Sequence, residues 1–309
     1  MHVCMLSYEK RARTRALEWR GSGLMGAMSQ SHGEISHVSD TALMVAACRA
    51  LEFDAPDGFV RDLFAARLAG ERGMAMLRAL PQPEMMRFGI GVRSRFVDEL
   101  LLETLASEKI ATVLSLGCGL DTRPWRLDVP EELRWIEVDF ADMLDYKNAR
   151  MSAERPRCRR EVIAADVNDE AQRCDIYAAV GPAPALMITE GFLMYLPAAT
   201  VEALAAEAGH TSGIAHWMSD ITTTAFMKAI SINTPQSVRN MQAPDCLNGE
   251  QILECVHGQG WRTAARRSYI TDMAFARERV QRMFGDRPQP VGPPPVTPDD
   301  PTGVHRFTR

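Results

Sequence analysis

The sequence of 309 residues lacks the patterns of several functional classes. Its seven cysteines form no CxxC pair and its seven histidines show no HExxH spacing, so we expect neither a disulfide framework nor a metal site. No apolar run approaches the roughly 18–20 residues of a membrane span, and the N-terminus lacks the apolar core of a signal peptide. A net charge of −5 gives no basic field of the kind that nucleic-acid binders use. These absences favour a cytoplasmic protein without a membrane or nucleic-acid partner.

What the chain does contain is one long stretch with the alternating pattern of an α/β domain. Residues 1–35 are polar and glycine-spotted, and we expect a disordered or misassigned leader. Residues 36–286 are expected to form a single domain, with helices over 36–108 and an α/β core over 109–286. The tail over 287–309 is dense in proline, and we expect it to be disordered.

Short apolar runs in the core alternate with helical patterns. Strands are expected at 110–116, 135–140, 161–165, 185–189 and 210–220. Helices are expected at 41–51, 62–68 (ended by Gly70), 92–106, 201–208 and 251–259. Strands that alternate with helices predict a mostly parallel sheet that is covered on both faces.

The turn after the first predicted strand reads LSLGCGLDTR and places Gly117 and Gly119 one residue apart. Glycine permits a tight turn and lets a ligand lie against the backbone, although a plain turn would use it as well. The dinucleotide fingerprint GxGxxG would need a third glycine where Thr122 stands. Asp139 ends the second strand, where a carboxylate can accept hydrogen bonds from a ribose. S-adenosylmethionine is a ribosylated ligand without a pyrophosphate and fits this pattern.

Five motifs, in order, resemble the leucine carboxyl methyltransferase family, and its bacterial branch most closely. They are SDTALMVAACRALE, VRSRFVDELLLE, LSLGCGLDTRPWRL, WIEVDF and ITEGFLMYLP, and the resemblance runs from about Ser39 to Trp261. It implies a Rossmann-like class I methyltransferase sheet of seven mostly parallel strands with an N-terminal helical lid. It also implies the cofactor S-adenosyl-L-methionine, converted to S-adenosyl-L-homocysteine. The family's antiparallel end strand would fall within 261–270.

The resemblance also implies the residues that bind the cofactor. They are Arg93 (or Arg95), Gly117, Gly119, Asp139, Asp166, Val167 and Glu190. Arg93 would hold the methionine carboxylate with paired donors, and Glu190 would meet the ammonium group. Asp139 would bind the ribose, while Asp166 and Val167 would meet the adenine. Each of these residues could instead have a structural role, as on a solvated helix face or at a cap.

Few residues are candidates for contact with the methyl acceptor. Tyr195 could face the acceptor as a catalytic residue, although packing would explain it equally well. His216 and Asp220 are the candidates for a base, and structural roles would account for both. Asp121 and Arg123 are expected to form an ion pair that ties the turn together.

The type of acceptor follows from what the chain lacks. A carboxylate is already ionised at neutral pH and needs no base, whereas a phenol would benefit from one, so carboxyl O-methylation is favoured over hydroxyl methylation. Protein-methylating relatives carry cations where Val45 and Asn168 stand, so we expect a small-molecule acceptor such as a polyketide-like metabolite. Two alternatives stay open: an NAD-dependent oxidoreductase, and a non-catalytic protein that binds the cofactor. The oligomeric state is not indicated.

Overall fold

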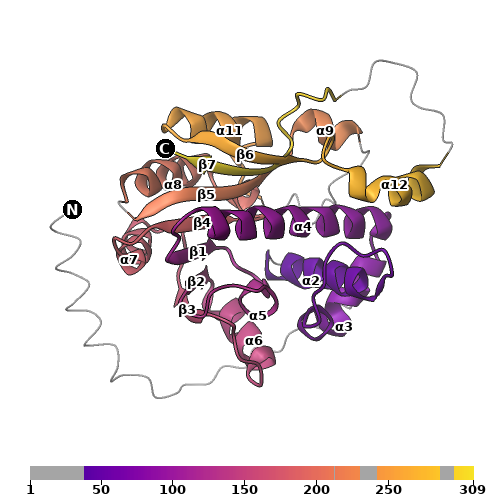
Figure 1. Ribbon diagram of the computed structural model, residues 1–309, viewed down its shortest axis with the longest axis horizontal. Coiled ribbons are helices and arrows are strands. Elements are labelled where there is room, and N and C mark those ends of the chain that lie inside the picture. Colours follow the sequence, from indigo (N-terminus) through magenta and orange to yellow (C-terminus); the bar gives the residue numbers. More distant parts are fainter. Residues whose placement is uncertain (1–37, 212, 230–241, 286–295) are drawn as a thin grey trace.

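The computed structural model describes residues 38–211, 213–229, 242–285 and 296–309 (Figure 1). Its centre is a seven-stranded sheet in the order β3-β2-β1-β4-β5-β7-β6. The strands are β1 (Thr112–Leu116), β2 (Arg134–Asp139), β3 (Arg159–Ala164), β4 (Ala185–Thr189), β5 (Ile214–Ile221), β6 (Arg262–Ser268) and β7 (Gly303–Thr308). The first five run parallel, β7 is antiparallel to both of its neighbours, β5 and β6, and β6 therefore has the same direction as the first five. The predicted mostly parallel sheet is confirmed. The expected placement of its antiparallel strand within 261–270 is wrong, because that segment forms β6, and the strand that opposes the others is β7.

Helices cover both faces of this sheet (Figure 1), so β1 and β4 are buried at every position. On one face, the core beneath α8 and α11 contains Trp217 and Trp261. On the other face, the long α4 packs against the sheet through Phe96 and its neighbours. After β1, the described residues form the helices α5 (Arg123–Arg126), α6 (Ala141–Met151), α7 (Glu170–Val180), α8 (Ala198–His210), α9 (Thr224–Ala229), α11 (Gly249–Gly258) and α12 (Arg277–Phe284).

Three helices of the described residues precede the sheet in sequence, and Figure 1 shows α2 and α3 lying beside α4. They are α2 (Val38–Asp54), α3 (Ala65–Arg78) and α4 (Pro83–Ser107). An apolar cluster that includes Leu43, Phe64 and Trp125 joins them to the turn after β1. The expectation that the second helix ends at Gly70 is wrong, because the chain kinks there with a φ of 57° and continues as a helix to Arg78.

The prediction of a disordered tail over 287–309 is wrong for its last residues, which form β7. This strand hydrogen-bonds to β5 on one side and β6 on the other. Phe307 is fully buried against Trp217. A strand that pairs on both sides gains its stability from its neighbours, so the prolines before it gave a misleading signal. The predicted leader over 1–35 and the tail residues 287–295 lie outside the described residues.

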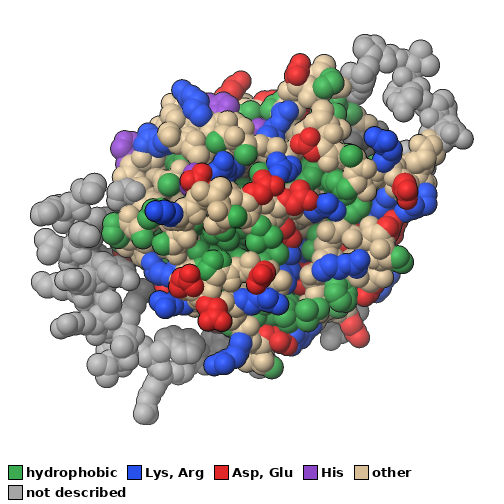
Figure 2. All heavy atoms as spheres, viewed as in Figure 1, with side chains coloured by type: hydrophobic (Ala, Val, Ile, Leu, Met, Phe, Trp, Pro, Cys, Tyr) green, Lys and Arg blue, Asp and Glu red, His purple; other side chains and the backbone are tan. Residues whose placement is uncertain are grey.

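Two further observations concern the classes that the composition disfavours. Within the described ranges, no helix combines the length and apolar character that a bilayer span requires. No group of three or more His, Cys, Asp or Glu side chains in the same ranges could hold a metal ion. Figure 2 shows basic and acidic side chains interspersed over one face of the molecule.

Candidate active site

A cavity of about 1090 Å³ lies at the carboxyl ends of β1, β2, β4 and β5. Its described wall includes the turn after β1, the end of β2, the segments after β4 and β5, and residues of α2 and α4. Ligands bind at this edge of open α/β sheets, because the strand order reverses there and leaves a crevice. The cavity therefore occupies the place that the glycine turn and Asp139 predict.

The glycine turn gives the cavity its inner edge. Gly117 and Gly119 have φ values of 62° and 45°, in the left-handed region that side chains disfavour. A Cβ on Gly117 would lie 2.3 Å from the ring of Phe192, which also lines the cavity. Both glycines are therefore required by the backbone itself, and Gly117 also makes room for an aromatic wall residue.

Asp139 lies beside this turn. Its Oδ2 accepts a hydrogen bond from the backbone N–H of Gly119 at 2.7 Å, and its Oδ1 accepts one from Phe140 at 2.8 Å. Burial raises the pKa of Asp139 above its usual range, although both N–H donors oppose this effect. Each carboxylate oxygen has a second lone pair, so the group can still accept hydrogen bonds from ligand hydroxyls.

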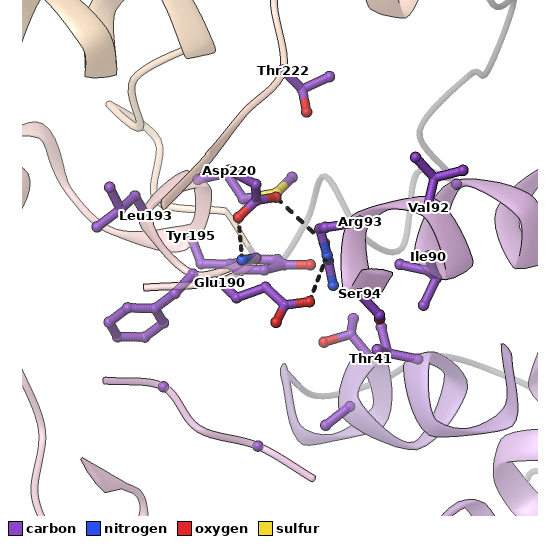
Figure 3. Close-up of a pocket in the computed structure, with 18 of the residues that line it drawn as sticks. Thr41, Ile90, Val92, Arg93, Ser94, Glu190, Leu193, Tyr195, Asp220 and Thr222 are labelled. Carbon is purple, nitrogen blue, oxygen red and sulfur yellow. Dashed lines mark hydrogen bonds and ion pairs between the residues drawn. The ribbon is translucent and has the colours of Figure 1, made fainter. Parts of the chain in front are cut away.

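Arg93 lies between two carboxylates elsewhere in the cavity wall (Figure 3). Its Nε donates to Glu190 Oε1 at 2.9 Å, and its Nη1 is 3.5 Å from Asp220 Oδ2. Arg123 binds the other oxygen of Glu190 at 2.6 Å. Burial alone would raise the pKa of Glu190, but Arg123 and Arg93 lower it below its usual range. A guanidinium beside a charged carboxylate suits a zwitterionic amino-acid group.

Behind Glu190, the predicted ion pair between Asp121 and Arg123 is present, with an Nη1–Oδ2 distance of 3.2 Å. Arg123 also donates to Asp98, which binds Arg126 with both carboxylate oxygens. Burial alone would raise the pKa of Asp121, but Arg123 lowers it to about 2. This buried cluster fixes the turn and the position of Glu190.

Asp220 was a candidate base, and the structure gives it other partners. Its Oδ1 accepts a hydrogen bond from the backbone N–H of Gly191 at 2.6 Å. Gly191 has a φ of 59°, and a Cβ there would lie 2.9 Å from Arg93 Nη1. Sequence reasoning missed the role of Gly191. The signal was the EG pair directly after β4, where a chain that turns left-handed most readily uses glycine.

Tyr195 lines the cavity from the 3-10 helix η1 (Leu193–Tyr195). Burial raises the pKa of its hydroxyl above the usual range, although a side-chain hydrogen bond with Thr41 of α2 opposes this. The hydroxyl is therefore neutral at physiological pH, and it can donate or accept a hydrogen bond without acting as a base.

Two other candidates are not part of the cavity wall. Arg95, the alternative to Arg93, donates to Glu99 at 2.7 Å on the same helix. His216 Nε2 lies 3.9 Å from Glu108, and burial lowers the pKa of this histidine below its usual range. Arg93 is thus the arginine that the structure brings to the site.

Asp166 and Val167 follow β3 and are not among the residues that line the cavity. The carboxylate of Asp166 accepts hydrogen bonds from the backbone N–H and the side-chain amide of Asn168, both at 2.9 Å. The amide oxygen of Asn168 in turn accepts a hydrogen bond from Thr200. This corner is held by its own hydrogen bonds, and its contact with adenine stays a prediction.

Comparisons with known proteins bear on this arrangement. The family model of leucine carboxyl methyltransferase matches residues 42–209, which is more than half of the chain. A protein of Streptomyces avermitilis, named as a putative S-adenosyl-L-methionine-dependent methyltransferase, is 37% identical over 190 residues, 57% of this chain and 66% of its own. A protein of Mycobacteroides abscessus with the same description is 36% identical over 200 residues, 58% of this chain and 63% of its own. The match thus spans just under two thirds of these relatives.

A solved structure supports the class I methyltransferase fold. The crystal structure of a putative methyltransferase from Thermobifida fusca covers 91% of this chain and 96% of its own, with 17% identity and a TM-score of 0.50. At that identity the likeness concerns the fold alone. The region that the family model matches contains the glycine turn, Asp139 and Glu190. The chain belongs to the leucine carboxyl methyltransferase family.

Proposed function

We propose that this protein is an S-adenosylmethionine-dependent O-methyltransferase that acts on a small-molecule carboxylic acid. One observation carries the proposal: a single cavity contains a ribose-type carboxylate, Asp139, and an arginine–glutamate pair, Arg93 and Glu190. Membership of the family and the names of the relatives support the same activity.

The groups of this cavity fit the cofactor in chemical type. Asp139 would accept hydrogen bonds from the ribose hydroxyls, and Gly119 would leave room for the ligand beside the backbone. Arg93 would take the carboxylate of the methionine part and Glu190 its ammonium group, so their present ion pair would open. Asp166 and Val167 remain the proposed contacts of the adenine.

The acceptor oxygen would have to arrive ionised, because the described wall offers no free base. No histidine lines it, and its carboxylates are held by arginines or backbone N–H groups. A carboxylic acid, with a pKa of about 4, meets this requirement, whereas a phenol, at about 10, does not. When bound, the cofactor supplies a methyl group activated by its sulfonium. The acceptor oxygen would bond to this methyl carbon as the C–S electron pair moves to sulfur, giving a methyl ester and S-adenosylhomocysteine.

A small molecule is proposed over a protein C-terminus because the expected cations are absent. Val45 lines the cavity as an apolar residue, and Asn168 is engaged with Asp166 and Thr200 outside the wall. We also propose a polyketide-like or related metabolite as the acceptor and the cytoplasm as the location. The six cysteines in the described ranges are all free thiols, which fits a reducing compartment.

Calorimetric titration with S-adenosylmethionine and S-adenosylhomocysteine tests the cofactor site. The wild-type protein should bind both, and Asp139→Ala should weaken binding at least about 10-fold, equivalent to about 1.4 kcal/mol. Asp142→Ala is the matched control, because Asp142 is an exposed carboxylate three residues away that does not line the cavity. Its affinity should match that of the wild type.

The other outcomes separate the alternatives. A wild-type protein that binds neither ligand would sink the cofactor assignment. Selective binding of NAD would restore the oxidoreductase alternative. Binding without methyl transfer to any member of a broad acceptor panel would favour a non-catalytic binding protein.

A further inference from the structure

Tyr269 lines the cavity and carries a buried hydroxyl to which no role is assigned. It directly follows β6 and lines the cavity. Its ring stacks on Phe96 of α4, with centroids 5.9 Å apart, and lies 6.0 Å from Phe226 of α9. These contacts fix the ring, yet the hydroxyl has no hydrogen-bond partner among the described residues.

Burial, more than the surrounding charges, keeps the hydroxyl of Tyr269 protonated. Burial raises the pKa of Tyr269 well above its usual value, and Asp220 raises it further, against the opposing effect of Arg93. The group is therefore a hydrogen-bond donor at physiological pH. A buried donor without a partner costs about 1–3 kcal/mol, so a polar group that enters the cavity gains by accepting from it.

The position of Tyr269 in the sheet separates it from the proposed ribose site. The order β3-β2-β1-β4-β5-β7-β6 places β6 at one edge, whereas Asp139 ends β2, next to the other edge. The cavity thus extends from the glycine turn, past the Arg93–Asp220 pair, to Tyr269 after β6. The end at Tyr269, beyond the residues proposed for the cofactor, is available to the acceptor.

The wall of the cavity is rich in methionine. Seven methionine side chains of the described residues line it, among them Met85 and Met86 of α4, Met227 of α9 and Met273 after β6, together with Phe88 and Phe226. Methionine is flexible and polarisable and adapts to apolar ligands of irregular shape. The volume of the cavity exceeds what a single drug-sized ligand usually needs. The wall therefore suits an apolar body beside a cofactor.

We infer that the acceptor is an amphipathic carboxylic acid whose carboxyl group accepts a hydrogen bond from Tyr269 and whose apolar body lies against the methionine wall. This inference rests on the proposed function, since it names the second substrate of the same site. Tyr269 is then a residue that contacts substrate and aligns the carboxylate for methyl transfer.

Methyl transfer to a graded series of acids tests the inference. Tritium from labelled S-adenosylmethionine is followed into the extractable methyl esters of hexanoate, decanoate and 4-phenylbutyrate. Decanoate should be favoured over hexanoate at least about 10-fold in kcat/KM, because four more methylene groups are buried. Tyr269→Phe should raise the KM for decanoate at least about 5-fold and leave the Kd for S-adenosylhomocysteine unchanged.

Tyr177→Phe is the matched control, because Tyr177 also has a buried hydroxyl without a partner among the described residues but belongs to α7 and packs against the core, outside the cavity wall. It should change neither constant. Equal effects of the two substitutions, or a rise in the Kd for S-adenosylhomocysteine in Tyr269→Phe, would overturn the role of Tyr269. If S-adenosylhomocysteine binds but no acid gives an ester, the acceptor class is wrong; if it does not bind, the proposed function itself fails.

Discussion

The carboxylate of Asp121 stays ionised in the folded protein because it is paired with Arg123. Arg123 lowers its pKa to about 2, from an ordinary value of 3.8. Because the folded-state pKa is the lower one, the stabilisation is fully present above the unfolded pKa and is lost as the pH falls through the folded value. Asp121→Asn should therefore lower the free energy of unfolding by about 2 kcal/mol at pH 7, and urea denaturation at pH 7, 5 and 3 should show this loss shrinking towards acid.

Asp128→Asn is the control for this pH dependence. Asp128 is fully exposed and lies 3.7 Å from Arg157, so solvent screens the pair. Its substitution should give the same small change at each pH. A constant difference between Asp121→Asn and the wild type from pH 7 to 3 would contradict the assigned ion pair.

The glycines of the cavity can be tested by a pair of alanine substitutions. Gly117 and Gly181 both have positive φ values, 62° and 77°, so alanine should cost each about 1–2 kcal/mol of stability. Only at Gly117 would the new Cβ collide with Phe192, while nothing lies within 4 Å of one at Gly181. Gly117→Ala should weaken binding of S-adenosylhomocysteine at least about 10-fold, and Gly181→Ala should leave it unchanged, as measured by calorimetry.

For single residues, the sequence predicts site residues that belong to local motifs better than those that come from distant parts of the chain. The LGCGLD turn and the acid at the end of the next strand predict Gly117, Gly119 and Asp139 in one cavity, since consecutive strands adjoin. Tyr269 could not be found this way. It lies far from those motifs in sequence, and a lone tyrosine after an arginine-rich strand has no local signature.

Among the elements, β7 is the strand that the sequence does not predict, and it joins β6 to the rest of the sheet. Phe307 is fully buried and lies edge-on to Trp217, with centroids 6.1 Å apart. Phe307→Ala should lower the free energy of unfolding by about 3–5 kcal/mol, because it leaves a cavity in the core. Val162→Ala on β3 is the control, since Val162 is 42% exposed and should cost far less. Comparable losses in urea denaturation would show that the strand is peripheral.

The strands of the sheet differ in how well the sequence predicts them. β1, β2 and β4 are short apolar runs buried from both faces, and the sequence places each within a few residues. β7 reads GVHRFT, with few apolar residues, directly after a proline-rich segment. Its burial comes from pairing between β5 and β6. Such pairing depends on segments far apart in sequence, and no local pattern reports it.

For the molecule as a whole, Glu52 connects three distant parts of the chain around the cavity. This fully buried carboxylate of α2 binds Arg87 of α4 at 2.8 Å and Arg279 of α12 at 2.7 Å. It also accepts the backbone N–H of Phe59. Glu52 thereby joins α2, α4 and α12, which together form one wall of the cavity. No pattern within any one of these helices predicts this connection.

Glu52→Gln should loosen this wall, because it leaves the buried guanidinium of Arg279 and the half-buried guanidinium of Arg87 without their shared counter-charge. The free energy of unfolding should fall by about 3 kcal/mol or more. Hydrogen exchange followed by mass spectrometry should show faster exchange in α12 and the first turns of α4, with α8 and α11 unchanged. Glu84→Gln is the matched control, because Glu84 pairs with the same Arg87 at 3.3 Å but is largely exposed. If both substitutions leave exchange in α12 as it is in the wild type, the three segments do not depend on Glu52, and the wall is held by apolar packing alone.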